Sequence, residues 1–172
     1  SETEKDRVFN AKIALWAQGS LSKGSRPRII SSTQPAAMHA ARTVAQVCGS
    51  SSISHEGGLS PLDRGTASGD VELGGMGFSQ RFPGGESFED LVRRLEPILL
   101  DVEASVEPVI VLAHAAPCRA LRAYFLSCDL VRCMGAASSP GAKALEHESR
   151  CVVEVLPEVG GGWIEKFHDC AA

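Results

Sequence analysis

One apolar run constrains the fold of this chain more than any other stretch. Residues 109–112 read VIVL, and the run is short and bounded by Pro108 and by a turn at Pro117. Such a run is typical of a strand buried on both faces of a parallel sheet. Because proline is compatible with the first turn of a helix, residues 117–127 are predicted to form the helix that follows. The stretch therefore predicts a strand, a turn and a helix in succession.

His114 stands where this predicted strand should end. In open α/β sheets, anions bind at the carboxyl ends of strands, next to the N-terminus of the following helix. A histidine in this place can also be a simple cap of the strand end. Taken alone, His114 fits the cap better than the anion site, so the neighbouring residues have to decide between them.

The rest of the chain alternates helical and extended patterns. Further helices are predicted over residues 4–18, 35–48 and 86–106, and strands over residues 28–32, 109–114, 151–156 and 163–167. The last two strands flank a glycine turn and should form a hairpin. This alternation predicts an α/β fold built as a three-layer α/β/α sandwich.

The helix over residues 86–106 has the clearest pattern. Ser87 and Asp90 form a capping box at its start. An apolar stripe follows at helical spacing and is expected to pack against the sheet; it includes Leu91, Leu95, Ile98 and Val102. Pro97 lies inside the helix and should bend it or mark a local break.

Two segments show no sustained periodicity. Residues 53–85 are rich in glycine and are predicted to be a loop, with one short strand near residues 52–54. Residues 134–149 are rich in alanine, serine and glycine and are also predicted to be a loop.

Composition limits the classes of function. A chain of 172 residues is long enough for one domain with a substantial core. The net charge of −4 argues against a nucleic-acid or membrane surface as partner, and no apolar run is long enough to span a bilayer. Six cysteines without a CxxC pair indicate reduced thiols in the cytoplasm. We expect no metal and no cofactor, because the cysteines and histidines lack metal-ligand spacing.

Residues 81–126 carry a long, gap-free motif. It reads PxGESxEDLxxRLEP, followed by a VxVxxH strand and an AYFL helix. This pattern resembles the fructose-2,6-bisphosphatase domain of 6-phosphofructo-2-kinase/fructose-2,6-bisphosphatase, in the histidine phosphatase (phosphoglycerate mutase-like) superfamily. The resemblance extends more loosely over residues 3–168, with IISSTQPAA similar to the family's second strand and its helix. It implies a phosphoglycerate mutase-like mixed sheet.

The resemblance also implies a set of catalytic parts. In the family, a histidine in an Arg-His-Gly triplet on the first strand attacks the phosphoryl group. A second arginine clamps the phosphate, a glutamate protonates the leaving oxygen, and a second histidine ends the fourth strand. By this resemblance His114 is the second histidine, and Arg81 and Arg119 are the phosphate- or substrate-binding arginines.

Several family positions hold other residues here. The clamp arginine falls at Ala36, the acid glutamate at Pro61, a lysine at Gly84 and a glutamine at Ala115, and no Arg-His-Gly triplet occurs in the 172 residues. Replacement acids are available at Glu56, Asp63 and Asp70, each of which fits a solvated loop carboxylate better. Among the remaining histidines, His39 and His55 fit surface positions, His147 loosely matches a family histidine, and His168 is assigned no role.

The implied sheet has strand order 3-2-4-1-5-6, which puts the family's first strand beside the strand that ends near His114. The sequence has no match to that first strand, so we expect residues 1–172 to be one histidine-phosphatase-like domain that is incomplete at its N-terminus. Two functions remain open. One is a non-catalytic pseudophosphatase with a regulatory or scaffolding role, an upstream kinase domain as partner, and a phosphorylated sugar or phosphate anion as ligand. The other is an active sugar-bisphosphate phosphohydrolase whose nucleophilic histidine lies upstream of Ser1.

Overall fold

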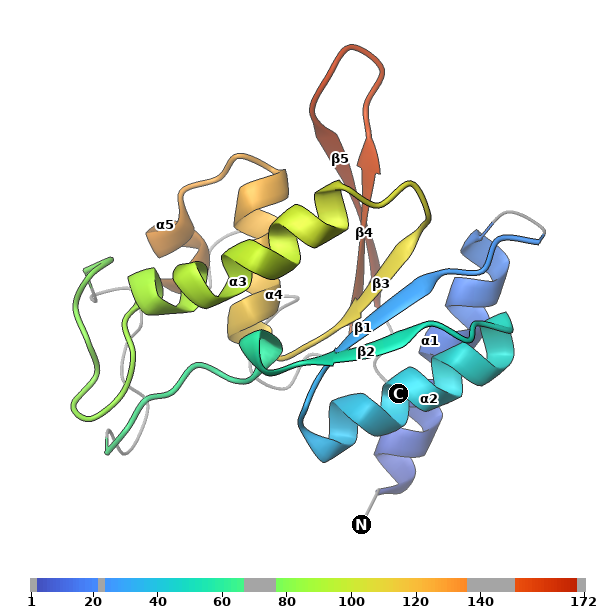
Figure 1. Cartoon of the computed structure of the whole chain (residues 1–172), viewed down its shortest axis with the longest axis horizontal. Coiled ribbons are helices and arrows are strands. Elements are labelled where there is room, and N and C mark those ends of the chain that lie inside the picture. The colour runs from blue at the N-terminus through green and yellow to red at the C-terminus, as the bar shows by residue number, and fades with distance from the viewer. Residues whose placement is uncertain (1–2, 22–23, 67–76, 136–150, 170–172) are drawn as a thin grey trace. The chain divides into compact units, whose positions relative to one another are not determined.

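The computed structural model describes residues 3–21, 24–66, 77–135 and 151–169 (Figure 1). The chain divides into two compact units, each assembled from separate segments. The first unit comprises residues 1–60, 97–114 and 170–172, and the second comprises residues 61–96 and 115–169.

A three-stranded parallel sheet forms the centre of the first unit. Its strands are β1 (Arg28–Ser32), β2 (Ile53–Glu56) and β3 (Val109–Leu112), in the order β2-β1-β3. In the register of the sheet, Ser31 is paired with His55 on one side and with Leu112 on the other. β1 is thus the central strand, and its apolar residues Ile29 and Ile30 are fully buried.

Two α-helices lie wholly within this unit. Helix α2 (Pro35–Cys48) starts with proline at its first turn and contacts all three strands. Its buried face consists mainly of alanine, which lets a helix approach a sheet or another helix closely. Helix α1 (Glu4–Ser20) begins with a capping box formed by Thr3 and Asp6, and it packs on α2.

Helix α3 (Phe88–Glu103) passes from the second unit into the first between Glu96 and Pro97. The helix continues through Pro97 rather than ending there. Leu91, Leu95 and Ile98 of the predicted stripe are buried, and Val102 is half-buried. The stripe is therefore an inward-facing one, as its spacing predicts.

The second unit also contains two short helices and a hairpin. Helix α4 (Ala115–Phe125) is followed by α5 (Leu130–Gly135), and the two pack together. Strands β4 (Cys151–Pro157) and β5 (Trp163–Asp169) are antiparallel. Arg122 on α4 forms an ion pair with Glu165 on β5, in which Nη2 donates to Oε2 at 2.7 Å.

The predicted α/β class is confirmed: a parallel sheet is flanked by helices. The strand over residues 28–32 and the helix over 35–48 have the predicted bounds, and the terminal hairpin is present. The strand predicted over residues 109–114 ends at Leu112, so His114 lies after it, and the helix predicted over residues 86–106 is shorter, Phe88–Glu103. Three further details differ. The short strand of the glycine-rich region runs to Glu56 and leads into a 3-10 helix, η1 (Gly57–Leu59); α4 begins at Ala115; and α5 was not predicted. Most of the loop predicted over residues 134–149 lies outside the described residues.

The described strands form one sheet of three strands and one of two. Within the described ranges, β3 pairs with β1 alone and β4 pairs with β5 alone. In the part of the chain that the structure describes, no helix is both long and apolar enough to cross a membrane.

Candidate functional site

The carboxyl edge of the three-stranded sheet gathers several polar residues of the first unit. Ser31 and Ser32 end β1 and are fully buried, and His55 and Glu56 end β2 beside them. His114 follows β3 by two residues, and β3 is the other neighbour of β1. We call Ser31, Ser32, His55, Glu56 and His114 the sheet-edge site, because parallel strands bring their carboxyl ends to one edge.

A short contact links the first two strands of this site. The Oγ of Ser31 lies 2.6 Å from the Nδ1 of His55. This is a hydroxyl–imidazole pair of the kind that activates a nucleophile. However, Ser31 has no exposed surface, so a substrate cannot reach its hydroxyl. The contact instead fixes the ring of His55, whose residue is exposed at the sheet edge.

His114 is half-buried in the two-residue link between β3 and α4. Its Nε2 is buried and has no hydrogen-bond partner among the described residues. Burial lowers the pKa of its imidazole below the ordinary value of about 6.5, because the charged form is poorly solvated there. A buried ring nitrogen without a partner is unusual in a folded protein.

The N-terminus of α2 opens at the same edge, directly after β1. Its N-cap residue, Gln34, makes no side-chain capping bond, and the backbone N–H of Gln34 donates to the Oγ of Ser32 at 3.2 Å. Free N–H groups and the helix dipole favour an anion at such an end. Ala36, at the position of the family's clamp arginine, is exposed in the first turn of α2. Glu56 adds a negative charge, so any anion site here is a weak one.

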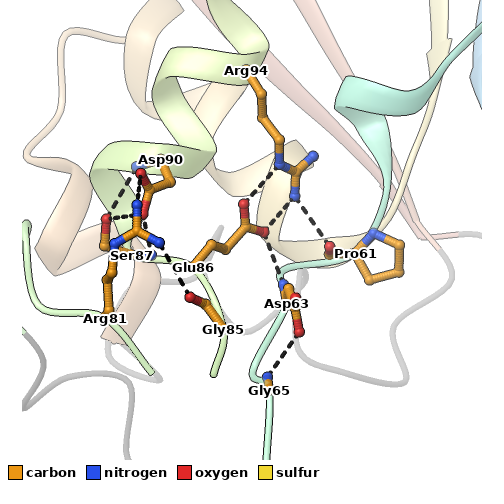
Figure 2. Close-up of polar contacts among 9 residues, drawn as sticks. All are labelled: Pro61, Asp63, Gly65, Arg81, Gly85, Glu86, Ser87, Asp90 and Arg94. Atoms are coloured by element: carbon orange, nitrogen blue, oxygen red, sulfur yellow. Dashed lines mark hydrogen bonds and ion pairs between the residues drawn. The ribbon is translucent and has the colours of Figure 1, made fainter. Parts of the chain in front are cut away.

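The second unit contains a network of polar contacts between a loop and the start of α3 (Figure 2). Its centre is Glu86, which accepts two bonds from Arg94, at 2.9 Å from Nε and 2.7 Å from Nη2. Glu86 also accepts the backbone N–H of Asp63 at 2.8 Å, and Arg94 donates to the carbonyl oxygen of Pro61 at 3.1 Å. Arg94 and Glu86 are both mostly buried, with 24% and 15% of their side chains exposed.

Arg81 belongs to the other half of this network. Its Nη2 donates to Oδ1 of Asp90 at 2.6 Å, while Oδ2 of Asp90 accepts the backbone N–H of Ser87 at 2.8 Å. The Oγ of Ser87 accepts the backbone N–H of Asp90 at 3.1 Å, which completes the predicted capping box. The hydrogen bonds from Ser87, and then the charge of Arg81, hold the pKa of the Asp90 carboxyl below its ordinary value. We call the residues labelled in Figure 2 the loop–helix network.

Two adjacent glycines shape the loop of this network. A Cβ on Gly85 would lie 2.4 Å from the carbonyl oxygen of Asp63, which accepts the N–H of Glu86 at 3.0 Å. The backbone segments are therefore too close to admit any side chain at this position. Gly84 differs: a Cβ there would meet open space, but its φ of +72° is in the left-handed region.

Arg119 lies on α4, within the second unit. Its Nη1 donates to the carbonyl oxygen of Met134 on α5 at 3.2 Å. Arg119 and Arg81 therefore each have a contact within the second unit, on different elements, whereas His114 belongs to the first unit. Their roles in binding phosphate stay predictions.

The other residues considered from sequence have simpler places. Asp63 forms a turn, because its Oδ1 accepts the N–H of Gly65 at 2.8 Å, and it is not a free acid. His39 is exposed on α2, and the Nε2 of His168 lies 3.2 Å from Glu154 on the neighbouring strand. Asp70 and His147 lie outside the described residues. The described ranges contain no group of three or more His, Cys, Asp or Glu side chains placed to hold a metal ion.

Sequence reasoning missed the two serines and the role of His55 in the sheet-edge site. The signal was available in principle, because parallel pairing of two short strands brings residues at their carboxyl ends together. It requires the register of the pairing, and strands of four and five residues do not determine it.

The chain belongs to the histidine phosphatase superfamily (branch 1), whose sequence profile matches residues 12–139. A 49-residue segment is 51% identical to 6-phosphofructo-2-kinase/fructose-2,6-bisphosphatase 4 of Rattus norvegicus, and covers 28% of this chain and 10% of that protein. A 45-residue segment is 49% identical to the 6-phosphofructo-2-kinase/fructose-2,6-bisphosphatase of Arabidopsis thaliana, covering 26% of this chain and 6% of that one. The matched segments thus span a tenth or less of these relatives.

Solved structures agree at the level of the fold. A mycobacterial glucosyl-3-phosphoglycerate phosphatase aligns with a TM-score of 0.67 and 18% identity, over 97% of this chain and 85% of that one. The alpha-ribazole phosphatase from Shigella flexneri aligns with a TM-score of 0.62 and 14% identity, over 96% and 82% of the two chains. The resemblance to the superfamily is therefore confirmed by the profile over residues 12–139, the solved structures share its fold, and the closer similarity to fructose-2,6-bisphosphatase is local.

Proposed function

We propose that this chain is a degenerate, phosphate-binding histidine phosphatase domain that does not turn over its ligand. The proposal rests on a contrast between the sheet-edge site and the first turn of α2. His114 remains, with a buried Nε2 that lacks a partner among the described residues, while Ala36 stands in the place of the clamp arginine. The site can still accept an anion weakly, but it has no guanidinium at the start of α2 to grip one.

The position of the acid supports the same conclusion. Pro61 aligns with the family's glutamate, and a proline side chain cannot donate a proton. Loss of a positioned general acid typically costs a factor of about 10²–10⁴ in rate. The backbone carbonyl of Pro61 is bonded to Arg94, so the segment is retained as part of the loop–helix network and not as an acid. The 172 residues also contain no Arg-His-Gly triplet to form a phosphohistidine.

The names of the relatives indicate which ligand to test first and which partner domain to expect. Their similarity makes fructose 2,6-bisphosphate the first ligand to test, with inorganic phosphate as the simplest substitute. A domain that binds such a ligand without hydrolysing it would serve regulation or scaffolding, and a kinase domain upstream would be its natural partner. The four cysteines described as free thiols, Cys48, Cys118, Cys128 and Cys133, fit a reducing compartment such as the cytoplasm.

The decisive experiment incubates the 172-residue chain with fructose 2,6-bisphosphate labelled at the 2-phosphate. Phosphate release and phosphorylation of histidine are both measured, and His114→Ala serves as the matched control. We expect neither product above the control, together with weak ligand binding that the control loses. Turnover above the control contradicts the proposal. Binding that is unchanged by His114→Ala reduces this histidine to a cap of the strand end.

A second candidate is an active sugar-bisphosphate phosphohydrolase whose nucleophilic histidine lies upstream of Ser1. It is favoured by one observation: within the described ranges, β3 pairs with a strand on one side only. A strand bearing Arg-His-Gly could add to its other edge. A longer protein that includes preceding residues would then become phosphorylated on histidine in the same assay, whereas the 172-residue chain would not.

A further inference from the structure

Two cysteines, Cys128 and Cys133, lie at the corner between α4 and α5, at defined positions relative to the N-terminus of α5. α5 begins at Leu130, and the backbone N–H of Cys133 donates to the carbonyl oxygen of Asp129 at 2.9 Å. That bond is the first one within the helix, so Asp129 is the N-cap residue. Cys128 then precedes the N-cap, and Cys133 is the fourth residue of the helix.

These two positions face each other at many helix N-termini. A side chain just before the N-cap packs against the fourth helical residue, an arrangement known as the hydrophobic staple. In this corner both positions are cysteine, and the Cys128 thiol lies near enough to the Cys133 thiol to raise its pKa. Ser127 makes the turn with a φ of +51°, and the N–H of Cys128 donates to the carbonyl oxygen of Ala123 at 2.8 Å, which fixes Cys128 at the corner.

We propose that Cys128 and Cys133 are a redox-active dithiol that closes to an intramolecular disulfide. The oxidant is a small-molecule disulfide of the glutathione class. The Cys128 thiolate attacks one sulfur of that molecule, forms a mixed disulfide and expels one small thiolate. The Cys133 thiolate then attacks Sγ of Cys128 and expels the second small thiolate. The two protein thiols lose two protons and two electrons, and the small disulfide is reduced to two thiols.

Exposure and charge determine the order of these steps. Cys128 is exposed and Cys133 is half-buried, so a soluble disulfide reaches Cys128 first. Burial raises the pKa of the Cys133 thiol, and the neighbouring Cys128 raises it further, whereas the guanidinium of Arg122 acts in the opposite direction. Once Cys128 is in a mixed disulfide it carries no charge, so one obstacle to forming the Cys133 thiolate is removed.

The cross-link would act on the segment that holds Arg119. Cys133 is followed by Met134, which is buried and whose carbonyl oxygen accepts the bond from Arg119. Closing the disulfide therefore fixes the first turn of α5 at the point where this arginine is anchored. Any effect on anion binding rests on the proposed function, whereas formation of the cross-link does not.

Peptide mapping tests the proposal directly. Trypsin cuts after Arg122, Arg132 and Lys143, so Cys128 and Cys133 fall in separate peptides, 123–132 and 133–143. The folded chain is incubated with a series of mixtures of oxidised and reduced glutathione, free thiols are blocked, and the digest is analysed by mass spectrometry. We expect the two peptides to be joined, and to separate on reduction. Cys48→Ser, which removes another half-buried thiol, should leave the joined pair unchanged.

Two variants resolve the order of attack. In Cys133→Ser, Cys128 should accumulate as a stable mixed disulfide with glutathione, because no second thiol can displace it. In Cys128→Ser, glutathione disulfide should modify Cys133 at least about tenfold more slowly than it modifies Cys128 in Cys133→Ser, since a half-buried thiol with a raised pKa reacts poorly. Circular dichroism confirms that each variant is folded. A persistent mixed disulfide in the unsubstituted chain, a pairing of Cys128 with a different cysteine, or no reaction at all overturns the proposal.

Discussion

The loop–helix network and the sheet-edge site differ in what their polar residues bond to. In the network, Glu86, Arg94, Asp63 and Asp90 bond one another or nearby backbone groups within the second unit. At the sheet edge, the Nε2 of His114 has no partner among the described residues, and an alanine stands where the family has its clamp arginine. Polar residues thus bond within the protein in one place, while the other place keeps a ring nitrogen without a partner among the described residues.

Under the proposed function, this contrast explains how a chain can resemble a phosphatase strongly and lack its chemistry. The PxGESxEDLxxRLEP motif includes Glu86, Ser87, Asp90 and Arg94, whose bonds are internal to the protein. Such residues are required for the loop and the helix to form, whatever the domain binds. The motif therefore reports on the fold, and it says little about turnover.

The largest expected effect concerns the apolar core beside the network. Leu95 is next to Arg94 on α3 and is 1% exposed. Replacing it with alanine should lower the free energy of unfolding by about 2–5 kcal/mol, because the deletion removes buried methyl groups and leaves a cavity. Denaturant titration measures the loss, and a value under about 0.5 kcal/mol would mean that the stripe of α3 does not pack as described. The free energy lost in this variant is the reference for the loss expected when a polar contact of the network is removed.

The second prediction tests whether the network stabilises the fold. Glu86→Ala removes the counter-charge of Arg94 and leaves the N–H of Asp63 without its acceptor. We expect a loss of about 2–4 kcal/mol in denaturant titration, since buried groups are left unpaired. The matched control is Glu89→Ala in the first turn of α3, whose ion pair with Arg93 is exposed and should contribute less than about 0.5 kcal/mol. Equal losses in the two variants would show that the network is an ordinary set of surface contacts.

The third prediction concerns anion binding at the sheet edge. Ala36→Arg restores a guanidinium at the exposed first turn of α2, where one charge-assisted bond to an anion contributes about 1.5–3 kcal/mol. Affinity for phosphate, measured by titration calorimetry, should rise about tenfold or more, without turnover. Thr33→Arg, an exposed substitution just before α2, adds the same charge at a different position and controls for general attraction. Equal gains would place the anion elsewhere.

The smallest expected effect is the pH dependence of anion binding. Because burial lowers the pKa of His114, the imidazole is neutral at pH 7, and a bound anion raises that pKa by favouring the charged ring. Sulfate affinity should therefore increase severalfold as the pH falls from about 7, and level off below the pKa of the free protein. Sulfate is chosen because its own charge is constant in this range.

Two histidine variants and the pH dependence of folding stability identify the group that causes this pH effect. His114→Ala should bind sulfate with a flat profile, while His55→Ala should keep most of the slope. Since the folded-state pKa of His114 is lowered, the unfolded chain takes up its proton first, and stability falls as the pH drops below about 6.5. Sulfate should reduce that loss. An unaltered slope in His114→Ala would exclude this histidine as the titrating group.

The elements of the fold were predictable because local patterns determine them. The short apolar run gave β3, the proline at residue 35 gave the start of α2, and Ser87 with Asp90 gave the start of α3. Contacts between distant segments were not predictable. The bond from Arg94 to Pro61 joins residues far apart in sequence, and the pairing of Ser31 with His55 depends on a strand register. Helix α5 was missed because six residues are too few for a helical period.

The backbone at Gly84 opposes a side chain at the position where the resemblance places a lysine. The family has a lysine at this position, and open space around a Cβ suggests that the side chain could simply be put back. With a φ of +72°, however, a lysine would have to hold a left-handed conformation at a cost of about 1–2 kcal/mol. Restoring the cation alone would thus be opposed by the fold, and the main chain would have to change with it. Introducing a lysine at this position would need a compensating change of the main chain, where a comparison of side chains suggests a single substitution.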